Sequence, residues 1–293
     1  MIKEFKKKLK QIINSILSNK EIIDNQNDIK LMIGKILANE NNQKEINKSE
    51  FKVFSQFGED GIINFIINNL KLKKNVFLEI GTENYQEANT RFLLENNNWS
   101  GAIIESNTEH IKFIKKQNYY WQRDLTLVNS FVTKENINLL IDNLVFKNDI
   151  SLLSIDIDGN DYWVWKELEL KPDIVVVEYN SRFGKEKSVT IPYDKNFRRP
   201  EKGKKRIYFG ASLLALKRLG DIKGYALITT NSAGNNAFFI KKEHLSDTLR
   251  EKSIDDCFIE NTFSEVIGEN NSIEKISKKS EKDFLFSLPL DEV

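Results

Sequence analysis

The sequence predicts an α/β fold, a Rossmann-like, doubly wound and mostly parallel sheet with helices on both faces. Two apolar runs carry this prediction, Val76–Ile80 with Gly81 after it, and Gly101–Glu105. They lie about one helix apart, and near-continuous apolar runs are typical of parallel strands buried on both faces. Further apolar runs alternate with helical periodicity along the chain, which is the pattern of an α/β sheet.

An N-terminal extension precedes this pattern. Apolar residues recur at helical spacing over residues 1–19, with lysines on the opposite face. A second helix is predicted over 28–38, and the polar stretch 39–50 is typical of a linker. The first helix can lie on a membrane surface, or pack on its own domain or on a partner subunit. Its apolar face lacks Trp, which favours packing, and terminal helices of this kind allow a homo-oligomer. We expect residues 1–50 to be a helical extension with a linker.

Residues 51–245 have the pattern of one α/β domain. Strands are predicted at 76–80, 101–105, 125–129, 152–156 and 173–178. Helices are predicted from Ser55, which can cap the first one, to Leu70, and at 88–96, around 111–114, at 134–144 and at 211–219. Two late runs, 225–229 and 236–240, predict an antiparallel hairpin that completes the sheet. Residues 246–293 have a mixed pattern, which we interpret as a partly helical tail.

The composition excludes several classes of protein. The chain has 293 residues, 40% hydrophobic and 30% charged, which suits a sizeable core and a solvated surface. A net charge of +1 gives no pointer to nucleic acid. The single cysteine, Cys257, excludes an intramolecular disulfide. No apolar run approaches the roughly 20 residues of a membrane span. We expect a cytoplasmic protein with no nucleic-acid partner and no membrane span.

The ends of the first two strands predict the cofactor. In a doubly wound sheet the ligand lies beyond the carboxyl ends of the strands, and the carboxylate of Glu105 can accept both hydroxyls of a ribose there. The turn at Gly81 has no second or third glycine, and Glu83 places a negative charge where a pyrophosphate would rest. This pattern argues against NAD or FAD. It favours S-adenosylmethionine, which has no phosphate and a cationic sulfonium.

The densest acid cluster begins at the end of the fourth strand, with Asp156, Asp158 and Asp161 around the turn residue Gly159. Buried carboxylates this close do not all ionise easily, so a metal ion, a cationic substrate group or a raised pKa must relieve them. With Glu178 and Asn180 after the next strand, Asp158 offers oxygen ligands for Mg²⁺ or Mn²⁺.

Asp161 would then accept a proton from a hydroxyl group that the metal acidifies. The alternative is that Asp158 or Asp161 is a helix N-cap. The two histidines, His110 and His244, lie at no predicted strand end, which argues against a Ser-His-Asp mechanism.

A basic segment follows the fifth strand. Residues 195–206 contain seven cationic side chains and one acid. A basic loop above an acidic floor suits a substrate that carries phosphate, such as a sugar nucleotide, and the alternative is a solvated surface loop. Two polar motifs are less specific: 55–61 reads as a cap and a turn, and 231–236 reads as a hairpin connection or one wall of a substrate pocket.

Several blocks in order resemble the FkbM-like branch of the S-adenosylmethionine-dependent methyltransferases. The matching blocks are Ser55-Gln-Phe-Gly-Glu-Asp-Gly-Ile62, Phe77-Leu-Glu-Ile-Gly81, Asn89-Thr-Arg-Phe-Leu-Leu94, Trp99-Ser-Gly-Ala-Ile-Ile-Glu105, Leu153-Ser-Ile-Asp-Ile-Asp-Gly-Asn-Asp-Tyr-Trp163, Val177-Glu-Tyr-Asn180, Tyr208-Phe-Gly-Ala-Ser-Leu213 and Asn231-Ser-Ala-Gly-Asn-Asn-Ala-Phe-Phe239. The resemblance covers residues 51–241 and implies a class I methyltransferase fold.

The resemblance also implies roles for individual residues. Glu79, Gly81 and Thr82 would approach the methionine part of the cofactor, and Glu105 its ribose. Asn129 and Ser130 would lie near the adenine, and Asp156 beside the cofactor. Asp156, Asp158 and Asp161 are the candidate catalytic residues, and Arg198, Arg199 and Tyr208 the candidate substrate contacts.

The turn from Asp158 to Asp161 further resembles metal-dependent sugar O-methyltransferases of macrolide pathways, which have a histidine base where Asp161 stands here. The implied activity is methyl transfer to an oxygen of a small acceptor, such as a sugar nucleotide or a surface-glycan (capsule) precursor. Another small acceptor (a phosphoramidate, a lipid or a metabolite) and a non-catalytic scaffold with the same fold are the alternatives.

Overall fold

The computed structural model describes residues 22–40 and 45–293. They belong to two compact units, divided between Asn42 and Gln43. In the first unit, residues 22–40 form one helix, which contains the helix predicted at 28–38; the helix predicted at 1–19 lies outside the described residues. Ile29, Met32 and Ile36 of this helix are exposed.

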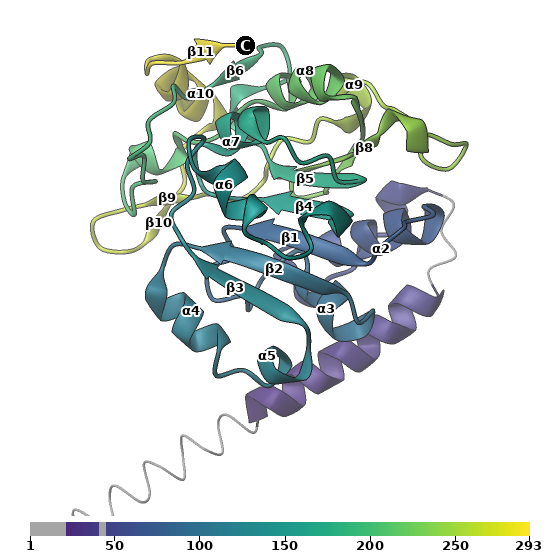
Figure 1. The fold of residues 1–293 in the computed structure, drawn as a ribbon. Coiled ribbons are helices and arrows are strands. Elements are labelled where there is room, and N and C mark those ends of the chain that lie inside the picture. Colours follow the sequence, from purple (N-terminus) through teal and green to yellow (C-terminus); the bar gives the residue numbers. More distant parts are fainter. Residues whose placement is uncertain (1–21, 41–44) are drawn as a thin grey trace, which may run out of the picture. The chain divides into compact units, whose positions relative to one another are not determined.

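A seven-stranded sheet is the centre of the second unit, in the order β3-β2-β1-β4-β5-β8-β7 (Figure 1). The strands are β1 (Val76–Ile80), β2 (Ser100–Glu105), β3 (Leu125–Asn129), β4 (Leu152–Ile155), β5 (Ile174–Glu178), β7 (Tyr225–Thr230) and β8 (Asn236–Lys241). The first five are parallel, and β8 pairs antiparallel with both β5 and β7. This topology confirms the predicted fold of the class I methyltransferase type, including the late hairpin.

Helices cover both faces of this sheet (Figure 1). The α-helices of the second unit are α2 (Glu59–Asn69), α3 (Arg91–Asn96), α4 (Thr108–Ile114), α5 (Asn118–Gln122), α6 (Ile137–Asp142), α7 (Asp161–Glu167), α8 (Leu213–Lys223), α9 (Ile254–Cys257) and α10 (Lys278–Phe286), of which α10 packs on a separate cluster that includes Phe183 and Ile207. The short helices are η1 (Ile46–Lys48), η2 (Lys147–Asp149), η3 (Ser181–Phe183), η4 (Lys204–Ile207) and η5 (Lys242–His244).

Alternate residues of one strand face opposite layers. Leu78 and Ile80 of β1 belong to the core that includes α6, α7 and α8, whereas Phe77 belongs to the core that includes α2, α3 and α5. Every residue of β1 is therefore buried. This double burial explains the continuous apolar runs by which the strands are recognised in the sequence.

Predicted helix starts differ from the structure, and two of them have a local reason. The first helix, α2, begins at Glu59 with Gly58 as its N-cap residue, but the Ser55 hydroxyl still accepts the Asp60 N–H at 3.1 Å and donates to the Asp60 carboxylate at 2.9 Å. The helix predicted from residue 211 begins at Leu213, because the Ser212 hydroxyl accepts the Ala215 N–H at 3.2 Å and so caps it. Serine hydroxyls are good N-cap acceptors, so the second start follows from local chemistry.

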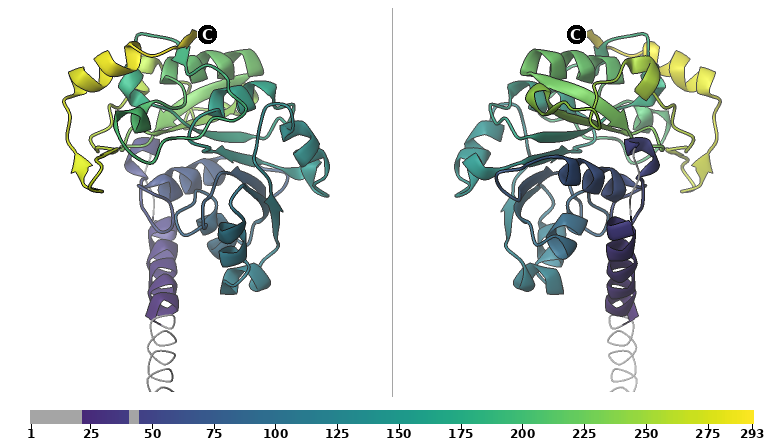
Figure 2. Two further views of the ribbon diagram at one scale, coloured as in Figure 1. Left: turned by 90° about the vertical axis from the view of Figure 1, so that its left-hand side faces the viewer. Right: turned by 90° about the vertical axis from the view of Figure 1, so that its right-hand side faces the viewer.

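The C-terminal segment 246–293 is part of the second unit. It contains α9, α10, β9 (Val266–Ile267), β10 (Ile273–Glu274) and β11 (Asp291–Glu292). Strand β11 pairs with β6 (Val189–Thr190), which comes from the connection after β5. Figure 2 shows α10 and the β9–β10 pair on the same side of this unit. No helix of the described residues is both long and apolar enough to cross a membrane.

Candidate functional site

A pocket of about 470 Å³ opens at the carboxyl ends of β1, β2, β4 and β5. Its sheet-derived lining includes Gly81, Glu105, Asp156 and Glu178, and the residues after β3 also contribute. This edge is where a doubly wound sheet binds its ligands. The lining also includes residues from 56–57, 87–89, 197–206, 235–236 and 263–265.

The turn after β1 requires a glycine. Gly81 has a φ of +78°, and a Cβ on it would lie 1.7 Å from the backbone oxygen of Asp156. Any side chain there would therefore collide with the end of β4, and the left-handed backbone also favours glycine. The neighbouring Thr82 lines the pocket, and its buried Oγ1 has no hydrogen-bond partner among the described residues.

Glu79 lines the same pocket and also holds the loop that follows β1. Its carboxylate accepts the N–H groups of Asn89 at 2.8 Å and Thr90 at 3.0 Å, together with the Thr90 hydroxyl. Burial raises the pKa of Glu79 to about 7, although these hydrogen bonds oppose the rise. The Glu79 carboxylate, which we predict to approach the cofactor, is thus already held in place by backbone N–H groups.

Glu105 ends β2 at the pocket. Its Oε1 accepts the Asn107 N–H at 2.7 Å and lies 3.6 Å from Nδ1 of His110. Within the described residues, Oε1 makes the polar contacts of this carboxylate, and Oε2 is therefore available for a ligand. Ser130 lines the pocket as predicted, but Asn129 does not, because its amide donates to the backbone oxygens of Glu105 and Ser106.

The acid cluster after β4 divides into two environments. Asp156 lines the pocket. Asp161 is fully buried outside the pocket lining, and its carboxylate accepts the N–H groups of Ile157 at 2.8 Å and Gly159 at 2.9 Å. Burial raises the pKa of Asp161 to about 6. Asp161 is the first residue of α7 and Asn160 its N-cap, so the alternative of Asp158 or Asp161 as the N-cap is wrong. The Asp161 carboxylate instead stabilises the turn before α7, and it does not line the pocket as a base for the acceptor would.

Two members of the predicted metal-ligand set of Asp158, Glu178 and Asn180 already have partners within the protein. The Asn180 amide donates to the backbone oxygens of Ile207 and Phe209 at 2.9 and 3.1 Å, and its Oδ1 accepts the Arg182 N–H. Asp158 forms an ion pair with Arg199. Asn180 is therefore bound within the protein, and Asp158 already has a cationic partner.

A different group of carboxylates converges. One carboxylate oxygen from each of Asp156, Asp161 and Glu178 lies within 4.8 Å of the others. Burial, followed by the neighbouring carboxylates, raises the pKa of Asp156 and of Glu178 well above their ordinary values. Glu178 Oε2 is buried without a hydrogen-bond partner among the described residues. The pocket floor thus holds a protonatable pair of acids, Asp156 and Glu178.

Arg199 supplies positive charge to this floor. Its guanidinium pairs with Asp158, and its Nη2 lies 2.6 Å from the Glu265 carboxylate. It also lies 3.8 Å above the ring of Phe209. Glu178 and Glu265 raise the pKa of Arg199, and burial opposes them. Arg199 is thus a fixed counter-charge of the acid cluster, and its two carboxylate partners leave it little capacity for a substrate phosphate.

The other two predicted substrate residues lie outside the pocket lining. Arg198 is exposed and stacks on Phe131, with its guanidinium carbon 3.3 Å from the ring centre. The Tyr208 hydroxyl donates to the backbone oxygen of Pro289 at 2.5 Å. Arg198 therefore packs against the pocket residue Phe131, and Tyr208 binds the C-terminal segment.

The two polar motifs form one wall of the pocket. Glu59 Oε1 accepts the side-chain amides of Asn231 at 2.7 Å and Asn236 at 3.0 Å, and Oε2 accepts the Phe57 N–H at 2.9 Å. The buried Glu59 thus joins segment 55–61 to the β7–β8 hairpin. Asn235 and Asn236 line the pocket, as one of the two interpretations of 231–236 predicts.

Sequence reasoning missed the contribution of the tail. Phe263 and Glu265 line the pocket, and the Phe263 ring stacks on Phe57 with centres 5.2 Å apart and planes 23° apart. Glu265 also pairs with Arg182 at 2.7 Å, so it joins Arg182 to Arg199. No periodicity or spacing in segment 246–293 marks these two residues.

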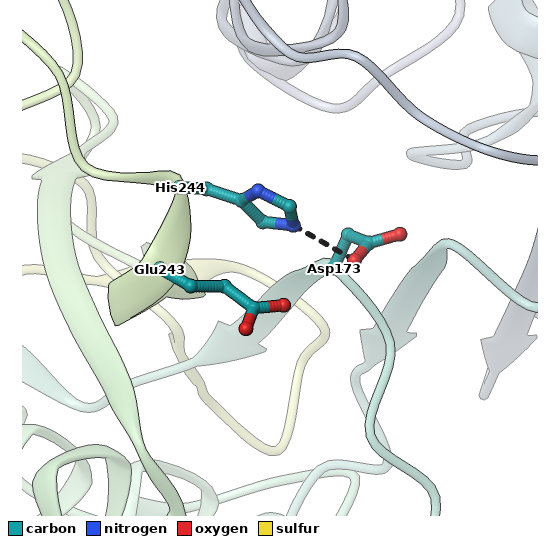
Figure 3. A group of neighbouring side chains, drawn as sticks. All are labelled: Asp173, Glu243 and His244. Atoms are coloured by element: carbon teal, nitrogen blue, oxygen red, sulfur yellow. Dashed lines mark hydrogen bonds and ion pairs between the residues drawn. The ribbon is translucent and has the colours of Figure 1, made fainter.

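A second group of possible ligands lies at the opposite edge of the sheet (Figure 3). Asp173, Glu243 and His244 approach one another, and His244 Nε2 lies 2.8 Å from Asp173 Oδ1. Lys241 Nζ binds the same Asp173 oxygen at 3.0 Å. Lys241, Lys242 and two further lysines line the adjoining hollow. Asp173 is already paired with Lys241 and His244, so we interpret the group as part of an ion-pair network.

No protein-family model and no curated protein matches the chain. Among solved structures it is similar to the N-terminal domain of EvdMO1 with S-adenosylhomocysteine (SAH) bound, at 9% identity, over 64% of this chain and 80% of that one, with a TM-score of 0.39. It is similar to an S-adenosylmethionine-dependent methyltransferase from Clostridium acetobutylicum, at 9% identity, over 62% and 90%, with a TM-score of 0.40. It is also similar to the O-methyltransferase from Bacillus cereus in complex with SAH, at 14% identity, over 75% and 88%, with a TM-score of 0.38.

Proposed function

We propose that this protein is an S-adenosylmethionine-dependent O-methyltransferase that acts on a small acceptor. The observation that carries the proposal is Glu105, which ends β2 at the pocket and keeps Oε2 available for a ribose hydroxyl. A carboxylate in this place accepts hydrogen bonds from a ribose, as in other doubly wound sheets. The second unit as a whole, tail included, would form the catalytic domain, because Phe263 and Glu265 contribute to the pocket.

The charge of the pocket supports this cofactor over a dinucleotide. Glu79, Glu83 and Glu105 lie on the side formed by β1 and β2. They would repel a pyrophosphate and attract the sulfonium and ammonium groups of S-adenosylmethionine. The unpartnered Thr82 hydroxyl, next to Gly81, suits a polar group of the methionine part.

The reaction would be an in-line displacement. The acceptor oxygen forms a bond to the methyl carbon, the carbon–sulfur bond breaks, and its electron pair stays on sulfur, which gives neutral SAH. The hydroxyl proton passes to the Asp156–Glu178 pair after the pair has lost its shared proton, because the raised pKa of both acids makes this form the stronger base. Alignment of the two substrates in the pocket supplies much of the rate.

A metal ion is not needed for this scheme. The predicted set of Asp158, Glu178 and Asn180 does not fit Mg²⁺ or Mn²⁺, because Asp158 pairs with Arg199 and the Asn180 amide is bound to the backbone. Arg199 supplies positive charge near the acids instead.

The acceptor that we propose is a sugar nucleotide or a surface-glycan precursor. Four phenylalanines at the pocket, Phe57, Phe131, Phe197 and Phe263, suit the apolar face of a sugar ring. The exposed cations of loop 195–206 suit a phosphate that extends from the pocket. A phosphoramidate, a lipid or another small metabolite is the alternative acceptor, and a non-catalytic scaffold is the alternative function.

Calorimetry with SAH tests the proposal first. The wild-type protein should bind SAH at one site, and NADH should not compete. Transfer of a labelled methyl group to a panel of sugar nucleotides and glycan precursors then tests the acceptor. Absence of SAH binding to a folded protein would rule out the methyltransferase and leave the scaffold.

A further inference from the structure

We propose that Arg206 binds an anionic group, a phosphate or a carboxylate, of a ligand in the pocket. This inference rests on the proposed function, and it names the residue that would select a charged acceptor. Arg206 belongs to η4 and lines the pocket. Among the described residues, it is the one cationic side chain of residues 195–206 that lines the pocket and forms no ion pair with a carboxylate.

The contacts of Arg206 are few. Its Nη1 donates to the backbone oxygen of Pro200 at 3.5 Å, which is a long hydrogen bond. Its Nε is buried and has no hydrogen-bond partner in the part of the chain that the structure describes. A guanidinium has five N–H donors, and leaving them unpaired while partly buried costs free energy. A bound anion would satisfy several of them at once.

Arg206 lacks an ion pair with the described residues even though many carboxylates line the same pocket. The described pocket lining has the carboxylates of Glu79, Glu83, Glu87, Glu105, Asp156, Asp158, Glu178 and Glu265, and two arginines. Arg199 pairs with two of these acids, Asp158 and Glu265. Arg206 pairs with none of them, so its charge is available. The planar fork of arginine matches the oxygens of phosphate or carboxylate in pairs.

The backbone places Arg206 on the acceptor side of the pocket. Arg199 Nε donates to the Arg206 backbone oxygen at 2.8 Å, and the same guanidinium pairs with Asp158, just after β4. The proposed cofactor lies at β1 and β2 instead. We therefore assign the anion to the acceptor. The carboxylate of the methionine part is the other source of the same chemistry.

Calorimetry on the full chain separates these sources with three probes. SAH carries the carboxylate, 5′-methylthioadenosine lacks it, and pyrophosphate added to the SAH complex represents the acceptor. The test variant is Arg206→Gln, and the matched control is Arg250→Gln, an exposed arginine outside the pocket lining that pairs with Asp247. Thermal unfolding of both variants shows whether they fold, and Arg206→Lys provides a second variant that keeps the charge.

We expect Arg206→Gln to weaken pyrophosphate binding at least tenfold, with SAH binding unchanged and with the Arg250→Gln control like wild type. A loss of SAH affinity with 5′-methylthioadenosine unaffected would assign the anion to the cofactor and still support an anion site at Arg206. Wild-type affinities for all three probes in folded Arg206→Gln would overturn the inference. If wild-type protein fails to bind SAH, the proposed function fails, and pyrophosphate binding to the free protein still tests Arg206.

Discussion

Asp156 and Glu178 lie at the ends of two neighbouring parallel strands, β4 and β5, and a carboxylate oxygen of one is within 4.8 Å of an oxygen of the other. Glu178 is buried and Asp156 is half-buried at the pocket. Two acids this close in a partly desolvated site share charge unfavourably, so the pair retains a proton at a pH where an isolated carboxyl group has lost it. The pair therefore behaves as one titrating unit.

The pair provides the first prediction. Glu178→Gln should lower the rate of methyl transfer by about 10²–10⁴-fold, because a positioned base contributes this much. The rate of the wild type should rise with pH as the pair loses its shared proton, and the variant should lose this rise. Rate measurements from pH 5 to 9 check it. SAH affinity should stay close to wild type, and an unchanged pH profile in the variant would point to another base.

The second prediction concerns the ribose. Glu105→Ala should weaken SAH binding by about 1.5–3 kcal/mol, because a charge-assisted hydrogen bond is lost. Glu109→Ala is the matched control, since Glu109 lies in the next helix and pairs with Lys112 at the surface. Calorimetry measures both. Equal affinities for the two folded variants would contradict the ribose assignment.

The third prediction is a pH dependence of stability. Burial raises the pKa of Glu79 from 4.5 to about 7, so the folded state binds its proton more tightly than the unfolded state does. The stabilisation is complete below pH 4.5 and is lost as the pH rises through about 7, with a size on the order of 3 kcal/mol. Asp60, with a pKa raised to about 6 by burial, acts in the same direction.

Denaturant unfolding at pH 5, 6, 7 and 8 tests this third prediction. Glu79→Gln should flatten the decline in stability, even though it lowers stability overall by losing an acceptor for Thr90. Asp221→Asn should leave the decline unchanged. Burial of Asp221 is outweighed by its ion pairs with Lys242 and Lys217, so its pKa is lowered and it does not titrate in this range. A Glu79→Gln profile parallel to wild type would refute the assignment.

The fourth prediction concerns metal dependence. Because Arg199 pairs with Asp158, exhaustive chelation should leave both SAH binding and methyl transfer intact. Elemental analysis of the purified protein and activity after EDTA treatment check it. Loss of activity that Mg²⁺ or Mn²⁺ restores would instead assign Asp156 and Glu178 as ligands.

Local sequence patterns predicted the sheet well and the site in part. Strands β1, β2, β4 and β5 are buried almost throughout, so their apolar runs are visible in the sequence, whereas the edge strand β3 is mostly half-buried. Gly81, Glu105 and Asp156 could be placed because a strand end fixes where the following residue points. Asn180 and Asp161 were misplaced because their partners, Ile207 and the N–H groups of the 157–159 turn, depend on loop conformation.

The basic segment shows a second limit. Its charge pattern is clear in the sequence, but the pattern does not tell which arginine is already paired. Arg199 meets Glu265, 66 residues away, and only the fold brings them together. Segment 246–293 was read as a tail for the same reason, since Phe263 and Glu265 act through contacts with distant residues.

The stacking of Phe57 on Phe263 joins two segments that are more than two hundred residues apart in the chain, at the rim of one pocket. A ligand bound there contacts both segments. Either segment can therefore move away from the pocket only when the ligand dissociates. Ligand at a concentration 100 times its dissociation constant would stabilise the state in which the two segments are in contact by about 2.7 kcal/mol. Cleavage by protease and amide exchange in residues 259–265 would therefore slow on ligand addition, and the C-terminal segment would report occupancy of a pocket built mostly by the other end of the domain.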